Sequence, residues 1–236
     1  VTTKALGENV ERHTEFDLQK VTAEEKEDLV VQESACDTNK HYTRIVLSQL
    51  SANAPKRGQI DKIRRHLSSI YRYFLRSEDV EIIVNGTFLE APNYKILNAP
   101  YYKTPDGDKI LWKRNIDFQM GDYKAKGFIA ILDKIQNGAN GLVLLRRGRV
   151  IVGGGDERYF PSVLFGQTGS FRYRRLFGEL ELEGFEVSFN KNGIREEDDL
   201  YLIGENIKEK FIFGTVYWFF HMVSDIAGSS TSIREA

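Results

Sequence analysis

Glycine-rich segments are the first candidates for chemistry, because the backbone N–H groups of such loops can bind phosphate. Residues 153–155 are three consecutive glycines, and Gly166 and Gly169 enclose Gln167 and Thr168. The first segment lacks the spaced glycines of a dinucleotide fingerprint, and the second lacks the lysine of a P-loop. We therefore expect both segments to be turns or mobile loops.

Side chains that could act as nucleophiles or metal ligands are few. Cys36 is the single cysteine, so neither an intrachain disulfide nor a cysteine-based metal site is expected, which is typical of a reducing compartment. The four histidines are His13, His41, His66 and His221, and their spacing matches no metal-binding motif. Glu179 and Glu181 share one face of a predicted strand, without any sign of a raised pKa. On its own, the chain offers no convincing catalytic site and no metal site.

Basic side chains offer another chemistry, because contacts from lysine and arginine to phosphates dominate the affinity for nucleic acids. Between Lys56 and Arg76 there are seven lysines and arginines and one aspartate, a local excess of six positive charges. The candidate contacts to DNA or RNA are Arg64, Arg65, Arg72, Arg146, Arg147, Arg149, Arg172, Arg174 and Arg175. A solvated basic surface is the competing interpretation, because no aromatic residues are interleaved on this face.

An amphipathic helix is predicted to position the first of these arginines. Its apolar residues are Ile60, Ile63, Leu67, Ile70 and Phe74, at alternating intervals of three and four. Pro55 and Gly58 precede this pattern and residues 77–79 follow it. We expect one helix over residues 59–76.

The other predicted elements are mostly strands. Strands are expected over residues 14–18 and 42–50, the second because RIVLSQL is rich in β-branched and aliphatic residues. Hairpins are expected around Asn85-Gly86, Gly121-Asp122 and Arg147-Gly148. Further strands are predicted over residues 176–182 and 184–189, and a helix start over residues 195–200. The charge run 23–28 is expected to be a solvated turn or short helix. This order predicts an α+β fold, with an antiparallel-rich sheet and few helices against it.

Composition limits the class of protein. The 236 residues are 41% hydrophobic and carry 33 lysines and arginines against 34 aspartates and glutamates, a net charge of −1. These values predict a soluble globular chain of one or two domains rather than a disordered one. The chain begins at Val1 without a signal-like segment, so we expect a processed product or fragment that is cytoplasmic. The apolar run 211–223 has 13 residues, short of the roughly 20 that span a bilayer, and is expected to be a buried element or a partner surface.

Four segments resemble one family. Residues 172–194 (RYRRLFGELELEGFEVSFNKNGI) look like the transducer segment of GHKL (histidine-kinase-like) ATP-binding proteins, which include gyrase B, MutL, the ninety-kilodalton heat-shock chaperone and MORC proteins. Residues 140–154 are similar to the strand-turn-strand before that segment. Residues 41–50 and 60–75 resemble the last strand of the ATPase domain and the helix that leaves it, so the resemblance covers roughly residues 10–205.

The resemblance implies a transducer domain, which acts as a molecular switch. Residues 1–52 would be terminal strands of an ATPase domain, 53–77 a connecting helix, 78–205 the transducer-like α+β domain and 206–236 an apolar tail of unknown role. In the family a transducer lysine contacts the γ-phosphate of ATP, and Lys191 is the matching residue, with Asn190 and Asn192 shaping its loop.

The motifs of the family's nucleotide pocket are missing, since Asp106-Gly107-Asp108 lacks the second glycine of the adenine loop and no glycine-rich lid precedes residue 41. The isolated chain is therefore expected neither to bind nor to hydrolyse ATP. ATP and magnesium would be bound only with an N-terminal nucleotide-binding domain as partner. The resemblance also implies DNA as a partner. A second copy of the chain is a further expected partner, and a membrane is not expected. A nucleic-acid-binding module that uses the nine arginines is the alternative function.

Overall fold

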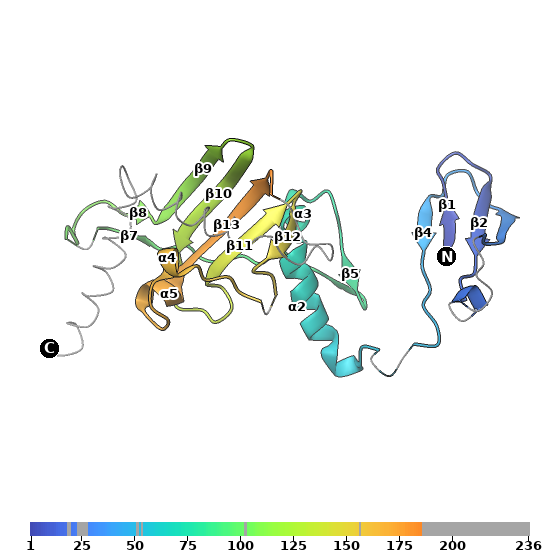
Figure 1. Cartoon of the computed structure of the whole chain (residues 1–236), viewed down its shortest axis with the longest axis horizontal. Helices are drawn as coiled ribbons and strands as arrows, with labels where there is room; N and C mark the ends of the chain where they lie inside the picture. Colours follow the sequence, from blue (N-terminus) through green and yellow to red (C-terminus); the bar gives the residue numbers. More distant parts are fainter. Residues whose placement is uncertain are drawn as a thin grey trace. The chain divides into compact units, whose positions relative to one another are not determined.

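The computed structural model describes residues 1–17, 20–22, 28–50, 52, 54–101, 103–155 and 157–185. The chain divides into two compact units, Val1–Pro55 and Lys56–Ala236 (Figure 1). Strands exceed helices in both units, and most strand pairs are antiparallel. The predicted α+β class is confirmed.

The first unit is a small antiparallel sheet. Its strands, in the spatial order β3-β2-β1-β4, are β1 (Thr2–Lys4), β2 (Val10–Thr14), β3 (Val31–Ala35) and β4 (Tyr42–Arg44). Lys4 is the only buried residue of the described part of this unit, and its Nζ donates to the carbonyl oxygens of Ala5 and Glu8 at 2.6 and 2.5 Å. The side chains of β3 are all exposed. The described part of this sheet therefore has no apolar core.

The strand predicted over residues 42–50 is shorter in the structure. β4 ends at Arg44, which lies opposite Thr2 in the antiparallel register with β1. Residues 45–50 are not in a strand. The strand predicted over 14–18 lies earlier, as β2, and most of the charge run 23–28 falls outside the described residues.

The predicted basic helix is confirmed with a break in its middle. A short 3-10 turn, η1 (Arg57–Gln59), leads into α2 (Ile60–Ile70), and α3 (Arg72–Ser77) follows. Tyr71 leaves helical geometry at φ −99° and ψ 18°, although its N–H still donates to Leu67 at 2.9 Å. Glu78 ends α3 in the left-handed conformation.

Three hairpins form at the predicted dipeptides. Asn85 and Gly86 both have positive φ, as a tight hairpin turn requires, and so do Arg147 and Gly148. The hairpin strands are β5 (Ile83–Val84) with β6 (Thr87–Phe88), β9 (Lys113–Met120) with β10 (Tyr123–Ile131), and β11 (Gly141–Arg146) with β12 (Arg149–Val152). A separate pair, β7 (Asn98–Ala99) with β8 (Ile110–Leu111), projects beyond the end of β9 and β10 (Figure 1).

The central element of the second unit is a five-stranded sheet in the order β12-β11-β13-β10-β9. β13 (Leu176–Glu183) is the last described strand, and it lies between two strands that precede it. It pairs antiparallel with β10 and parallel with β11. The parallel pair needs a crossover, which contains β12, α4 (Ser162–Phe165) and α5 (Phe171–Arg175).

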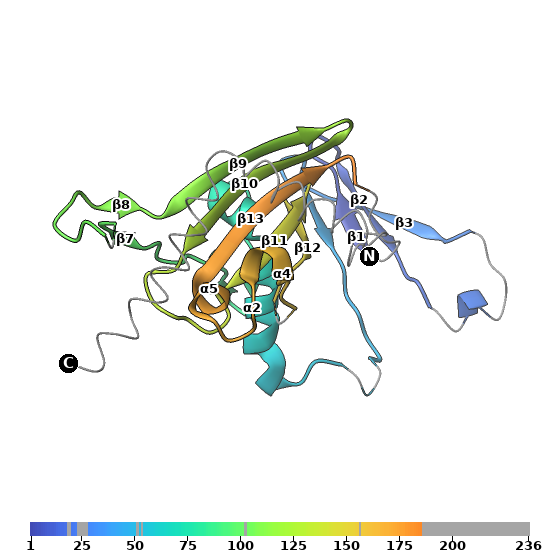
Figure 2. The same cartoon turned by 60° about the vertical axis from the view of Figure 1, so that its left-hand side comes forward.

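The two faces of this sheet differ in what they bury. We call one the core face, where strand residues pack with α4 and α5 around the cluster Trp112, Ile116, Phe118, Leu142, Leu144, Leu164, Phe165, Leu176, Leu180 and Leu182. The alternate residues point to the other, helix face, where Val143, Leu145 and Val150 are buried and α3 contacts Glu179 of β13. α4 and α5 thus lie on the opposite side of the sheet from α2 and α3 (Figure 2).

Candidate functional site

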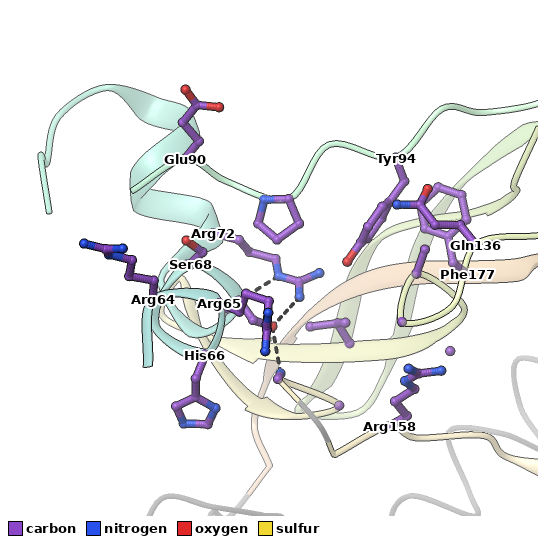
Figure 3. Close-up of a pocket in the computed structure, with 18 of the residues that line it drawn as sticks. Arg64, Arg65, His66, Ser68, Arg72, Glu90, Tyr94, Gln136, Arg158 and Phe177 are labelled. Atoms are coloured by element: carbon purple, nitrogen blue, oxygen red, sulfur yellow. Dashed lines mark hydrogen bonds between the residues drawn. The ribbon is translucent and has the colours of Figure 1, made fainter. Parts of the chain in front are cut away.

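A pocket lies in the second unit beside α2. Its volume is about 660 Å³. Its described lining comes from α2 and the start of α3, from residues between 87 and 94 and between 136 and 143, from Gly153, Gly155 and Arg158, and from β13 (Figure 3). This volume is within the range of small-molecule sites, roughly 300–1,000 Å³.

A buried ion pair joins the helix to the sheet next to this pocket. Arg72 is 3% exposed, and its Nη1 donates to Glu179 Oε1 at 2.9 Å. Its Nε and Nη2 donate to the carbonyl oxygen and the hydroxyl of Ser69 at 2.8 and 2.7 Å, and the same hydroxyl accepts from the N–H of Gly155 at 2.8 Å (Figure 3). The network therefore fixes α2, β13 and the glycine segment 153–155 to one another.

Arg76 makes the second contact to Glu179. Its Nη1 and Nη2 donate to the two carboxylate oxygens at 2.5 and 2.8 Å, and Nη2 also donates to the carbonyl of Pro92 at 3.1 Å. Burial alone would raise the pKa of Glu179, but the guanidinium groups of Arg76 and Arg72 outweigh burial and hold that pKa below its ordinary value. Glu179 is thus a buried carboxylate that stays charged.

Three basic side chains line the pocket without a carboxylate partner among the described residues. Arg65 and His66 extend from α2, and Arg158 comes from the loop on the other side of the pocket (Figure 3). Arg158 donates through Nη1 to the side-chain oxygen of Asn140 at 3.0 Å, which holds it at the rim. Glu90 is the acidic residue that lines the described pocket.

Glycines allow two of these side chains to approach the backbone closely. A Cβ added at Gly155 would lie 2.5 Å from His66 Nδ1, and one at Gly138 would lie 3.3 Å from Arg158 Nη2. Gly153 has φ +79°, and its added Cβ would lie 2.0 Å from the carbonyl oxygen of Leu142. The segment 153–155, expected as a turn or mobile loop, is therefore closely packed in the wall of the pocket.

The second glycine segment has a separate role. Gly166 ends α4 at φ +65°, and an added Cβ there would lie 2.0 Å from Arg172 Nη2. Ser170 begins α5, with its hydroxyl accepting from the N–H of Tyr173 at 3.1 Å. Residues 166–170 therefore form a helix-to-helix turn beside the core face.

The nine arginines singled out in the sequence are not on one surface. Arg65 is exposed on α2, whereas Arg174 is exposed on α5, across the sheet, where its guanidinium lies over Phe171. Arg147 is exposed in the β11–β12 turn, and Arg146 and Arg149 are half-buried beside it.

The remaining arginines of that set have structural contacts. Arg72 is buried against Glu179, although the positive charge of the segment 56–76 predicted an exposed contact to phosphate. Arg64 donates to the carbonyl of Val84 at 3.3 and 3.1 Å and pairs with Asp61 at 2.9 Å. Arg175 donates to the carbonyl of Leu132 at 2.9 and 2.6 Å, and burial lowers the pKa of Arg175 and of Arg172.

The residues that the family resemblance implies lie outside the described residues. These are Asn190, Lys191 and Asn192, together with the predicted helix start at 195–200 and the apolar run 211–223. The predicted strand over 184–189 has only Gly184 and Phe185 in the described part, where neither is in a strand.

No three His, Cys, Asp or Glu side chains of the described chain are grouped so that they could hold a metal ion. Within the same residues, no helix has the length and apolar character needed to cross a bilayer.

Sequence reasoning missed the pairing of Glu179 with Arg72 and Arg76. The available signal was a glutamate within the apolar segment 176–182, since a charge on a buried strand requires an opposite charge nearby. The partners are more than 100 positions away, at 107 and 103 residues, so local patterns did not identify them.

Comparisons with known proteins add no relative. No family model matches the chain, and no curated protein matches it significantly.

Proposed function

We propose that this chain is the transducer portion of a GHKL-type ATPase, which relays the state of a bound nucleotide. The nucleotide pocket then belongs to an N-terminal domain that also binds magnesium, and the isolated chain has no ATPase activity. The resemblance of residues 140–154 and 172–194 supports this proposal, together with the β-rich sheet and the helix α2 that precedes it.

The observation that carries the proposal is the apolar segment after β4. Ile45, Val46, Leu47 and Leu50 are 66%, 71%, 74% and 58% exposed. The described sheet before them has no apolar core, although an independent domain needs one. Residues 1–50 therefore fit the end of a larger sheet better than a domain of their own. This is what the resemblance of residues 41–50 to the last strand of an ATPase domain implies.

Lys191 is the proposed sensor of the γ-phosphate. A lysine ammonium is a compact positive charge on a flexible chain, suited to a single phosphate oxygen. A contact made with the γ-phosphate is lost in the ADP state, and that differential interaction can shift the population of two domain arrangements. The same charge offsets the negative charge that develops during phosphoryl transfer.

The direct test is Lys191→Ala in the protein that carries the nucleotide-binding domain. We expect kcat for ATP hydrolysis to fall at least tenfold, about 1.4 kcal/mol, with ADP affinity nearly unchanged. Lys134→Ala is the matched control, because Lys134 is an exposed lysine of the second unit. Unaltered turnover in Lys191→Ala would refute the assignment.

Calorimetry on the isolated chain gives a second test. A non-hydrolysable ATP analogue with magnesium should produce no binding that depends on Lys191. Tight binding that is lost in Lys191→Ala would mean that the chain builds a complete nucleotide site, and the proposed division between two domains would be wrong.

A further inference from the structure

We propose that the pocket beside α2 is a binding site for a small organic phosphate, with Arg65 and Arg158 holding the phosphate group and Tyr94 contacting the organic part. The site is separate from the proposed contact of Lys191 with ATP. Its described lining belongs to the second unit.

The charge of the pocket selects an anion. Among the described residues, its lining contains five lysines and arginines and one acidic residue, Glu90. Two of the five are used structurally, since Arg72 pairs with Glu179 and Arg64 with Asp61. Arg65 and Arg158 have no carboxylate partner among the described residues, so the local field is positive. Guanidinium groups match the paired oxygens of a phosphate.

Arg65 and Arg158 come from different walls of the pocket, so a ligand that binds between them could contact both. Arg65 and His66 extend from the helix, whereas Arg158 lies across the pocket (Figure 3). Because Gly155 and Gly138 have no side chain, His66 and Arg158 can lie close to the backbone at these two positions in the pocket wall. Arg158 is also oriented by its hydrogen bond to Asn140, which lowers the entropy lost when it binds an anion.

An aromatic wall supplies the contact for the organic part. Tyr94 is half-buried and stands edge-on to the buried Phe177, with ring centroids 5.7 Å apart and an interplanar angle of 86°. Figure 3 shows Tyr94, Gln136 and Phe177 together on the side of the pocket away from α2. A volume of about 660 Å³ holds a small phosphorylated compound rather than a phosphate ion alone.

A small molecule fits better than a nucleic-acid strand. A strand would need basic residues that continue along one surface. The exposed Arg174 instead lies on α5, on the opposite side of the sheet from Arg65. The exposed Arg147 lies in the β11–β12 turn and is not part of the pocket lining, so the exposed arginines do not form one continuous track.

The test uses phenyl phosphate, inorganic phosphate and an oligothymidylate as probes at constant ionic strength, with the full chain in a calorimeter. Phenyl phosphate should bind one-to-one, more tightly than inorganic phosphate. Arg65→Gln and Arg158→Gln should each weaken it about tenfold, since each removes one charge-assisted contact. Tyr94→Ala should remove the preference for phenyl phosphate over inorganic phosphate. Arg174→Gln, the matched control, should change the affinity less than twofold.

Three results would overturn the proposal. The first is the absence of phenyl phosphate binding at millimolar concentration, with all variants folded by circular dichroism. The second is binding that Arg65→Gln and Arg158→Gln leave unchanged. The third is oligothymidylate binding that is far tighter than phenyl phosphate and weakened equally by Arg174→Gln, which would indicate a general nucleic-acid surface. Binding that depends on Arg65 and not on Lys191 keeps this site distinct from the proposed function.

Discussion

Glu179 connects the helix and the sheet through opposite charges within a buried environment. Removing two charges from water is costly, so such a pair adds little net stability, but leaving one member unpaired is strongly destabilising. Arg72 is 3% exposed, and its Nε and Nη2 already donate to Ser69, so Glu179 is the carboxylate that neutralises its buried charge. The main role of Glu179 is therefore to fix the position of α2 and α3 on β13.

Glu179→Gln is expected to reduce the free energy of unfolding of the second unit by about 3 kcal/mol, because it leaves the Arg72 charge buried without a counter-ion. Glu183→Gln on the same strand is the control. Glu183 is exposed and lies 3.5 Å from Lys124, so its loss should cost less than about 1 kcal/mol. Urea unfolding followed by tryptophan fluorescence measures both. Equal effects of the two substitutions would contradict the buried role of Glu179.

The stability should also depend on pH through Glu179. Its pKa in the folded state is below the ordinary value of 4.5, so the stabilisation is complete above about pH 4.5. It is lost as the pH falls through the lower folded-state value, where the carboxyl becomes protonated. Comparing urea midpoints from pH 6 to pH 3, we expect Glu179→Gln to show a shallower fall than the unaltered chain. Parallel pH profiles would show that Glu179 is not the group responsible.

At the scale of elements, local turn chemistry was sufficient to predict the hairpins. Asn85-Gly86 and Arg147-Gly148 adopt the positive φ values that tight turns require, and the period of the apolar residues identified α2. The spatial order of the sheet could not be read in this way, because the parallel pairing of β11 with β13 joins segments more than 30 residues apart. The pocket was missed for the same reason, since its described walls come from segments that are far apart in the sequence.

Gly153→Ala tests the close packing of the glycine segment. The added Cβ would collide with the Leu142 carbonyl, and φ +79° is unfavourable for alanine, so we expect a loss of about 2–4 kcal/mol. Gly58→Ala is the matched control, because nothing lies within 4 Å of the added Cβ and its φ is not positive. Thermal unfolding of the two variants distinguishes them. A Gly153→Ala chain as stable as the Gly58→Ala chain would contradict the register of β11 with residue 153.

At the scale of the whole molecule, the two units differ in how they are stabilised. The second unit buries the large apolar cluster of the core face, whereas the described part of the first unit buries only Lys4. A sheet of this size without a disulfide or an apolar core is marginal in isolation. The sequence predicted strands in this unit but not the absence of a core. Ile45, Val46 and Leu47 are residue types that are typical of buried strands, so the pattern did not show that they would be exposed.

Hydrogen exchange should separate the two units. We expect the amides of β1 and β4 to exchange at least about a hundredfold faster than those of β10 and β13, because opening the first sheet exposes little buried apolar surface. Mass spectrometry of the native chain after deuterium labelling measures this ratio. Comparable protection of the two sheets would contradict the proposal that the first unit belongs to a larger domain.

The central position of β13 in the sheet affects how the chain folds while it is being synthesised on the ribosome. When the chain has been synthesised as far as Arg175, β9–β10 and β11–β12 are two hairpins with no strand between them. Their common sheet can close only after Leu176–Glu183 has left the exit tunnel and inserted between β10 and β11. Until then the apolar residues of both hairpins lack their shared neighbour, so the nascent chain passes through a stage that is open to aggregation and suited to chaperone binding.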